Sequence, residues 1–122
     1  MWARFAWLRA CLRPQGLVSW WPGDGNANDV QGGNSGTLQG GATVVPGKVG
    51  QAFSFDGVND YVQVGNQANL KMTNVVTIEA WIFPTGPGSD GIIVNKEGEY
   101  EIARFADGTI QWAFANTNPG WV

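Results

Sequence analysis

The chain has 122 residues, a formal net charge of −3, 18 glycines, six prolines and only 14% charged residues. This length fits one domain with one hydrophobic core. The composition favours many short strands joined by tight turns over helices. The acidic balance argues against nucleic acid as a partner, because phosphate contacts need clustered lysine and arginine.

Histidine is absent, and Cys11 is the only cysteine. The absence of histidine removes the usual general base, the Ser-His-Asp and Cys-His constellations, and histidine-based zinc or copper sites. A single cysteine cannot form an intrachain disulfide. Catalysis by any of these constellations is therefore excluded.

The first 15 residues differ from the rest of the chain. They carry three of the seven cationic side chains and no acid, which leaves four cationic against ten anionic side chains in the remainder. A transmembrane span needs about 20 consecutive apolar residues. Arg9 interrupts the apolar residues of this segment, so we expect no membrane segment. We favour a leader foreign to the domain; the alternatives are a degenerate secretion signal and an amphipathic helix that packs Trp2, Phe5 and Leu8 on the body. The predicted division is a basic, aromatic leader at 1–15 and a domain at 16–122.

The domain is predicted to begin with a strand at Leu17–Trp21, which a Pro-Gly pair ends because proline cannot continue a central ladder. Trp20 and Trp21 point to opposite faces of such a strand. One is therefore expected in the core, and the other could be exposed, where an indole can stack on a sugar ring. Two further short strands are predicted at Gly36–Leu38 and Ala42–Val45.

An oxygen-rich loop follows the first predicted strand, from Asp24 to Asn34. It differs from an EF-hand, which needs glycine at the sixth position and glutamate at the twelfth, where Asp29 and Ser35 stand. Calcium could still be held by Asp24, Asp29, Asn34 and, from a later segment, Asp60. The alternative is an Asx turn without metal.

The stretch Gly47–Val64 reads GKVGQAFSFDGVNDYVQV. Two alternating runs, 52–56 and 61–64, flank a tight turn in which Gly57 can take a positive φ. We therefore predict an antiparallel hairpin in which these two runs pair with each other.

Val75–Phe83 is the strongest predicted strand. Aliphatic residues take one face, while Trp81 and Phe83 share the other with Glu79, so both faces are predicted to be largely covered apart from Glu79. Three further strands are predicted at residues 92–95, 100–105 and 110–115. The last two are joined by a hairpin turn at Asp107-Gly108.

Glu97, Glu99 and Glu101 alternate along the chain. On a strand they would share a face at steps of about 6.6 Å. Two of them could then act as acid and nucleophile, because retaining glycosidases place two carboxyl groups about 5 to 5.5 Å apart. The alternative is a solvated acidic edge, because Gly98 indicates a turn after Lys96.

Three segments resemble bacterial laminin G-like domains of the concanavalin A-like lectin/glucanase superfamily. They are GLVSWWPGDGNANDVQGGNSGTLQGGA (16–42), GKVGQAFSFDGVNDYVQV (47–64) and VVTIEAWIFPTG (75–86). The resemblance implies an all-β fold, namely a jelly-roll antiparallel β-sandwich, in a secreted or extracellular protein. It also implies a sandwich that is incomplete at its C-terminus, because the resembling domains continue with further strands. We expect a second copy or a partner protein to cover the open sheet.

The resemblance also implies a function. Members are often carbohydrate-binding and often calcium-bound, so we expect a non-catalytic, lectin-like module that binds a glycan or polysaccharide, with calcium as a stabilising cofactor. A planar aromatic ring beside polar groups suits a sugar, and Trp20, Trp112 and Trp121 are the candidates. Laminarinase-type hydrolases of the superfamily carry an acidic triplet on a concave strand, which the glutamates match in part. The alternatives are therefore a glycoside hydrolase that uses these glutamates and a protein-interaction or adhesion module.

Overall fold

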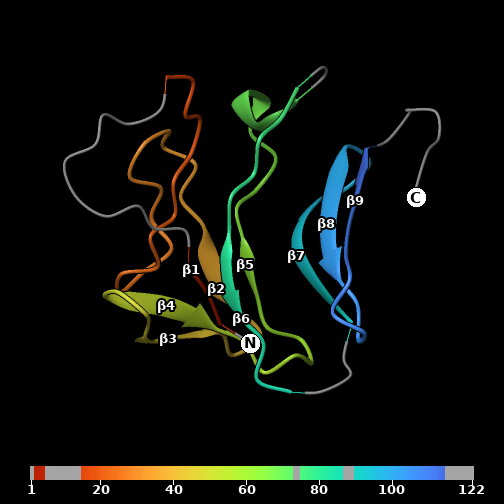
Figure 1. The fold of residues 1–122 in the computed structure, drawn as a ribbon. Coiled ribbons are helices and arrows are strands. Elements are labelled where there is room, and N and C mark those ends of the chain that lie inside the picture. The colour runs from red at the N-terminus through yellow and green to blue at the C-terminus, as the bar shows by residue number, and fades with distance from the viewer. Residues whose placement is uncertain (1, 5–14, 73–74, 87–89, 115–122) are drawn as a thin grey trace. The chain divides into compact units, whose positions relative to one another are not determined.

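The computed structural model describes residues 2–4, 15–72, 75–86 and 90–114 (Figure 1). Its strands are β1 (Trp2–Arg4), β2 (Thr37–Gln39), β3 (Thr43–Pro46), β4 (Gln51–Ser54), β5 (Tyr61–Gln63), β6 (Trp81–Phe83), β7 (Gly91–Lys96), β8 (Tyr100–Arg104) and β9 (Ile110–Phe114). One 3-10 helix, η1 (Ala68–Leu70), completes the regular structure of the described residues. Every paired strand runs antiparallel to its neighbour, which confirms the all-β prediction. None of the described helical structure has the length and apolar character of a membrane-spanning segment.

The chain divides into two compact units, Met1–Pro84 and Thr85–Val122. The first unit contains a four-stranded sheet in the order β3-β4-β1-β6 and a two-stranded sheet of β2 and β5. β4 lies inside the larger sheet, and its residues Ala52 and Phe53 are 0% and 2% exposed. Because successive side chains of a strand point to opposite faces, both faces of β4 are covered.

The predicted hairpin of the Gly47–Val64 stretch is wrong, although its turn chemistry is right. β4 pairs with β3 and β1, whereas β5 pairs with β2, so the two runs belong to different sheets. The connecting loop is closed by its own side chains: Asp56 Oδ1 accepts the N–H of Val58 at 2.8 Å, and Asp60 Oδ2 accepts the N–H of Asp56 at 2.9 Å. A tight, self-bonded turn therefore carries the chain from one sheet to another.

The start of the chain is part of the first unit's sheet. β1 lies between β4 and β6, with Trp2 in register with Ser54 on one side and Phe83 on the other. The alternative of a first helix is therefore wrong for residues 2–4, which are extended. Residues 5–14 lie outside the described part of the chain.

One predicted strand is absent, and another is shorter than predicted. Leu17–Trp21 forms no strand, because its backbone bonds to a loop: the Trp20 N–H donates to Asp29 Oδ1, and the Trp20 carbonyl accepts from Val30. Within 75–83, only Trp81–Phe83 pairs as a strand. The partners of Trp20 lie in the next loop, and the partner of β6 is β1 at the other end of the first unit's sequence, so alternation within each segment does not reveal them.

The second unit contains a three-stranded meander in the order β7-β8-β9 (Figure 1). The three strands and the hairpin that joins the last two agree with the prediction. The turn at Asp107-Gly108 is confirmed: Gly108 has φ +90°, and Asp107 Oδ1 accepts the N–H of Thr109 at 2.8 Å. The turn between β7 and β8 contains Gly98 at φ +73°. β7 carries a bulge between Ile92 and Val94.

Candidate functional site

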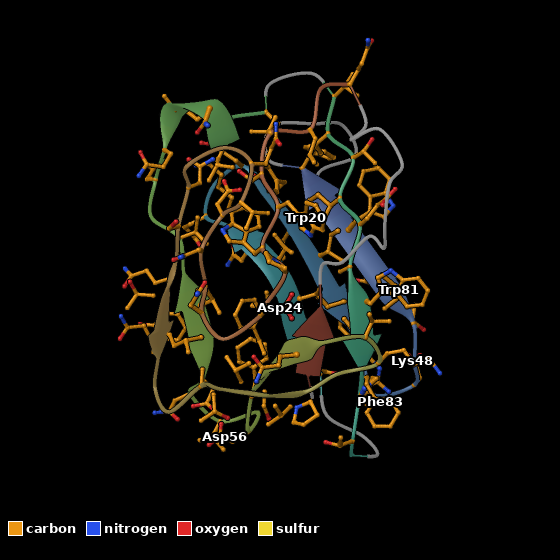
Figure 2. All side chains as sticks on the ribbon, turned by 90° about the vertical axis from the view of Figure 1, so that its left-hand side faces the viewer. Trp20, Asp24, Lys48, Asp56, Trp81 and Phe83 are labelled. Atoms are coloured by element: carbon orange, nitrogen blue, oxygen red, sulfur yellow. The ribbon has the colours of Figure 1, made fainter. Side chains whose placement is uncertain are left out.

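One face of the segment that ends in β6 is exposed to solvent. From residue 75 to residue 83, exposed and half-buried side chains alternate at every position, as in an extended chain. On the exposed face, Trp81 is 64% and Phe83 is 54% exposed. Both rings project outward on the same side of β6 (Figure 2).

Polar side chains continue this face toward the N-terminus. Glu79 and Thr77 are exposed and precede Trp81 by two and four residues. Same-face residues of an extended chain lie about 6.6 Å apart, so a carboxylate, a hydroxyl and two rings form one row. The prediction that this face is largely covered is therefore wrong. Alternation shows that the two faces of an extended segment differ, but it does not show which face packs against another part of the protein. We call Thr77, Glu79, Trp81 and Phe83 the β6 row.

The loop after Pro22 is organised by Asp29, which is only 9% exposed. Its Oδ1 accepts three backbone N–H groups, from Trp20 at 2.9 Å, Gln31 at 2.8 Å and Gly32 at 3.0 Å. Its Oδ2 accepts the N–H of Asn34 at 2.9 Å. This carboxylate therefore holds together two backbone segments that are separated in sequence.

The same contacts determine the acidity of Asp29. Burial by itself raises the pKa of this carboxyl group, but the four backbone N–H donors outweigh it and lower the pKa from 3.8 to about 2. Asp29 is therefore a charged, structural group at neutral pH.

Neighbouring groups complete the network around this loop. Asn34 is 4% exposed; its Nδ2 donates to Ser19 Oγ at 2.6 Å, and its carbonyl accepts the indole N–H of Trp21 at 2.8 Å. Trp20 is half-buried, and its backbone belongs to the network. The Asx-turn interpretation of the loop is thus supported by direct contacts.

The four predicted calcium ligands do not converge. Asp29 already accepts four N–H donors, and Asp24 Oδ1 accepts the N–H of Gln51 at 2.9 Å. Asp60 has one buried carboxylate oxygen, Oδ1, without a hydrogen-bond partner. Within the described ranges, no three acidic, histidine or cysteine side chains form a group that could hold a metal. Calcium prefers six to eight oxygen ligands, and these residues do not fit one such shell.

The acidic run does not lie on one strand face. Glu97 and Glu99 lie in the turn that joins β7 to β8, and Glu101 lies on β8, so the shared-face geometry is wrong. Glu99 Oε1 forms an ion pair with Lys96 Nζ at 3.0 Å. Burial and, to a smaller degree, the charge of Glu99 raise the pKa of Tyr100. The sharp turn at Gly98 accounts for the difference.

The three predicted sugar-binding tryptophans are not brought together in one unit. Trp20 belongs to the first unit, and Trp112 lies on β9 in the second, 61% exposed. Trp121 lies outside the described residues. The Trp112 ring meets Phe114 edge-on at 5.8 Å, and Phe114 lies 6.3 Å from Tyr100. Sequence reasoning missed Trp81 and Phe83 as candidates. The signal was present in the sequence, because Thr77 and Glu79 precede them on the same face.

A family model described as "Concanavalin A-like lectin/glucanases superfamily" matches residues 56–122, which is more than half of the chain. The matched range begins in the loop before β5 and contains β5 to β9. No curated protein and no solved structure matches the chain. Together with the antiparallel all-β fold, the match confirms the resemblance seen in the sequence: the chain belongs to the concanavalin A-like lectin/glucanases superfamily.

Proposed function

We propose that this chain is a non-catalytic, lectin-like module that binds a glycan along the β6 row. The observation that carries the proposal is the pair Trp81 and Phe83, both more than half exposed on one face. Aromatic rings offer flat apolar surface to the C–H face of a sugar, while the Glu79 carboxylate and the Thr77 hydroxyl suit sugar hydroxyl groups. Membership of a superfamily that contains lectins supports the same function.

The length of the β6 row favours an extended polysaccharide over a single terminal sugar. Thr77 and Phe83 are six residues apart, which corresponds to about 20 Å of extended chain. A row of this length, with rings at one end and polar groups at the other, suits several consecutive sugar units.

Trp112 provides a matched control for this proposal. It is the same residue type with nearly the same exposure, 61% against 64% for Trp81, but it lies on β9 of the other unit. Its ring contact is with Phe114, and the residue two positions before it is the apolar Ile110, whereas Glu79 stands two positions before Trp81. Comparing substitutions of the two tryptophans therefore distinguishes stacking on a sugar from the mere exposure of an indole ring.

The experiment measures binding of laminarin, xylan and chitin oligosaccharides by calorimetry. For a bound glycan, we expect Trp81→Ala to weaken affinity at least about tenfold, because losing a large apolar contact costs about 1.5 to 3 kcal/mol. Phe83→Ala should weaken it less, and Trp112→Ala should leave it unchanged. Binding that survives Trp81→Ala, or that only Trp112→Ala abolishes, contradicts the proposed site, and no binding to a broad glycan panel contradicts the function.

The proposal excludes hydrolysis by the acidic run. Glu97 and Glu99 lie in a turn and Glu99 is paired with Lys96, which supports a structural role for these acids. We expect no release of chromophore from aryl β-glycosides and no shortening of the bound glycan. Turnover that Glu99→Gln or Glu101→Gln abolishes would establish the glycoside hydrolase instead.

A further inference from the structure

We propose that Asp56-Gly57 is a site of spontaneous covalent modification, at which aspartate rearranges to isoaspartate through a succinimide faster than at the other Asp-Gly pairs of the chain. This inference does not depend on the glycan proposal, because it uses no residue of the β6 row. The chain contains four Asp-Gly pairs, at 24–25, 56–57, 90–91 and 107–108. The dipeptide is reactive because glycine has no side chain to hinder attack by its nitrogen.

The reaction joins the nitrogen of Gly57 to the side chain of Asp56. The nitrogen gives up its proton and attacks Cγ of the protonated carboxyl group, a C–N bond forms, and the carboxyl hydroxyl leaves with a proton as water. Water then adds to one of the two carbonyl carbons of the five-membered ring and breaks the bond from that carbon to the nitrogen. Cleavage at the former side-chain carbon restores aspartate, and cleavage at the main-chain carbon gives isoaspartate. One water leaves and one enters, so the mass is unchanged and no other reactant is needed.

The nitrogen of Gly57 is available for this attack. Among the described residues, no hydrogen-bond acceptor is present for its N–H. Gly57 is exposed, and a Cβ at its position would meet nothing within 4 Å, so the approach is open. A glycine whose N–H is bonded to a carbonyl must first break that bond. The attack at Gly57 starts without this cost.

The carboxyl group of Asp56 is folded back over the peptide that it must attack. Its Oδ1 accepts the N–H of Val58 at 2.8 Å and, more weakly, the N–H of Asn59 at 3.4 Å. These contacts keep the carboxyl group beside the following backbone. Negative charge develops on a carboxyl oxygen when the nitrogen attacks Cγ, and N–H donors already directed at Oδ1 stabilise this charge as an oxyanion hole does.

Asp107-Gly108 is a matched control within the same chain. Both pairs are exposed, both glycines have positive φ, +80° and +90°, and Asp107 Oδ1 also accepts the N–H two residues ahead, from Thr109 at 2.8 Å. The difference lies in the nucleophile, because the N–H of Gly108 donates to the Phe105 carbonyl at 2.9 Å. The N–H of Phe105 in turn donates to the Thr109 carbonyl at 2.8 Å, which closes the turn a second time. Ring closure at this pair therefore requires a bonded turn to open.

The remaining two pairs are held by contacts with distant segments. Asp24 Oδ1 accepts the N–H of Gln51 at 2.9 Å, and the glycine after Asp24 donates its N–H to a carbonyl at 3.1 Å. Asp90 Oδ1 accepts the N–H of Ala106 at 2.8 Å, and the glycine after Asp90 is the first residue of β7. Both carboxyl groups must leave these partners before they can meet the nitrogen.

The test incubates the whole folded chain at mildly acidic pH and measures isoaspartate at each pair over time. Peptides from a digest are separated by liquid chromatography, and electron-transfer fragmentation gives ions that distinguish isoaspartate from aspartate. We expect isoaspartate to accumulate at position 56 at least about threefold faster than at 107, because one net hydrogen bond corresponds to a rate factor of about two to ten. Positions 24 and 90 should fall behind position 56 by at least the same factor.

A parallel incubation in urea is the control for the local sequence. Unfolding removes the hydrogen bonds and leaves every glycine in place, so the rates at 56 and 107 should become nearly equal. Circular dichroism confirms the folded and unfolded states. A folded chain in which position 56 stays unmodified, or in which 24, 90 or 107 is modified as fast, overturns the proposal. A preference for position 56 that persists in urea also overturns it, because the local sequence would then account for the rate.

Discussion

The Asp29 carboxylate and the backbone of Trp20 are tied by a 2.9 Å hydrogen bond, and the Trp20 carbonyl accepts the N–H of Val30 at 2.9 Å. These two contacts hold Trp20, which precedes the Asp24–Asn34 loop, against Asp29 and Val30 within that loop. With the N–H donors of Gln31, Gly32 and Asn34, they make one carboxylate the centre of a loop that would otherwise lack partners for its backbone.

Asp29→Asn should destabilise the protein by about 2 to 3 kcal/mol. The amide keeps one acceptor oxygen but loses the charge and turns an N–H₂ donor toward a backbone donor, and hydrogen bonds to charged groups contribute about 1.5 to 3 kcal/mol. Urea unfolding at neutral pH measures the change. Asp107→Asn is the control, since Asp107 accepts the N–H of Thr109 in an exposed turn, and we expect a clearly smaller loss than for Asp29→Asn. Equal losses in the two variants would contradict the central role of Asp29.

The pKa of Asp29 predicts how stability depends on acid. Its folded pKa of about 2 lies below its ordinary value of 3.8, so its contribution is complete above about pH 4 and is lost as the pH falls toward 2. The shift corresponds to at most about 2.4 kcal/mol, and screening by water reduces the expected loss to about 1 to 2 kcal/mol. The measurement is the wild-type free energy of unfolding minus that of Asp29→Asn, between pH 6 and pH 2. A difference that stays constant over this range would show that Asp29 titrates normally.

Alanine substitutions at Gly40 and Gly98 distinguish the cost of backbone strain from the cost of steric overlap. Both have positive φ, +76° and +73°, so alanine at either position is strained by about 1 to 2 kcal/mol. At Gly98 a Cβ would meet nothing within 4 Å, whereas at Gly40 it would overlap the carbonyl oxygen of Asn59. We expect Gly40→Ala to lower the free energy of unfolding by at least about 2 kcal/mol more than Gly98→Ala does. Similar losses would show that the β2–β3 turn does not pack against the loop before β5.

Calcium is tested by melting the protein with calcium and with a chelator. A ligand that binds the folded chain raises the midpoint, by mass action. Because backbone donors occupy Asp29 and the other acids of the predicted site do not join it, we expect the same midpoint in both conditions. A midpoint that rises with calcium, and does so less in Asp60→Asn, would place a cation at the buried Asp60 Oδ1.

The sequence by itself determined the features that depend on neighbouring residues. The turn at Asp107-Gly108 follows from an aspartate that bonds its own backbone and a glycine that accepts positive φ, and the strands around it follow from period-two alternation. Alternation at 75–83 also persists, residue by residue. The family resemblance followed from short motifs in the right order and is confirmed from residue 56 onward.

Only the tertiary structure decided partners and exposure. Alternation in β4 and β5 indicates extended backbone, but it does not identify the partners: β4 pairs with the preceding β3 and with the distant β1, and β5 pairs with β2. The same limit applies to β6, where Trp81 and Phe83 were expected to be covered and are exposed. The same limit applies to Asp29. Its carboxylate oxygens can bind a cation or a backbone amide, and the backbone N–H groups that the fold places around Asp29 decide between the two.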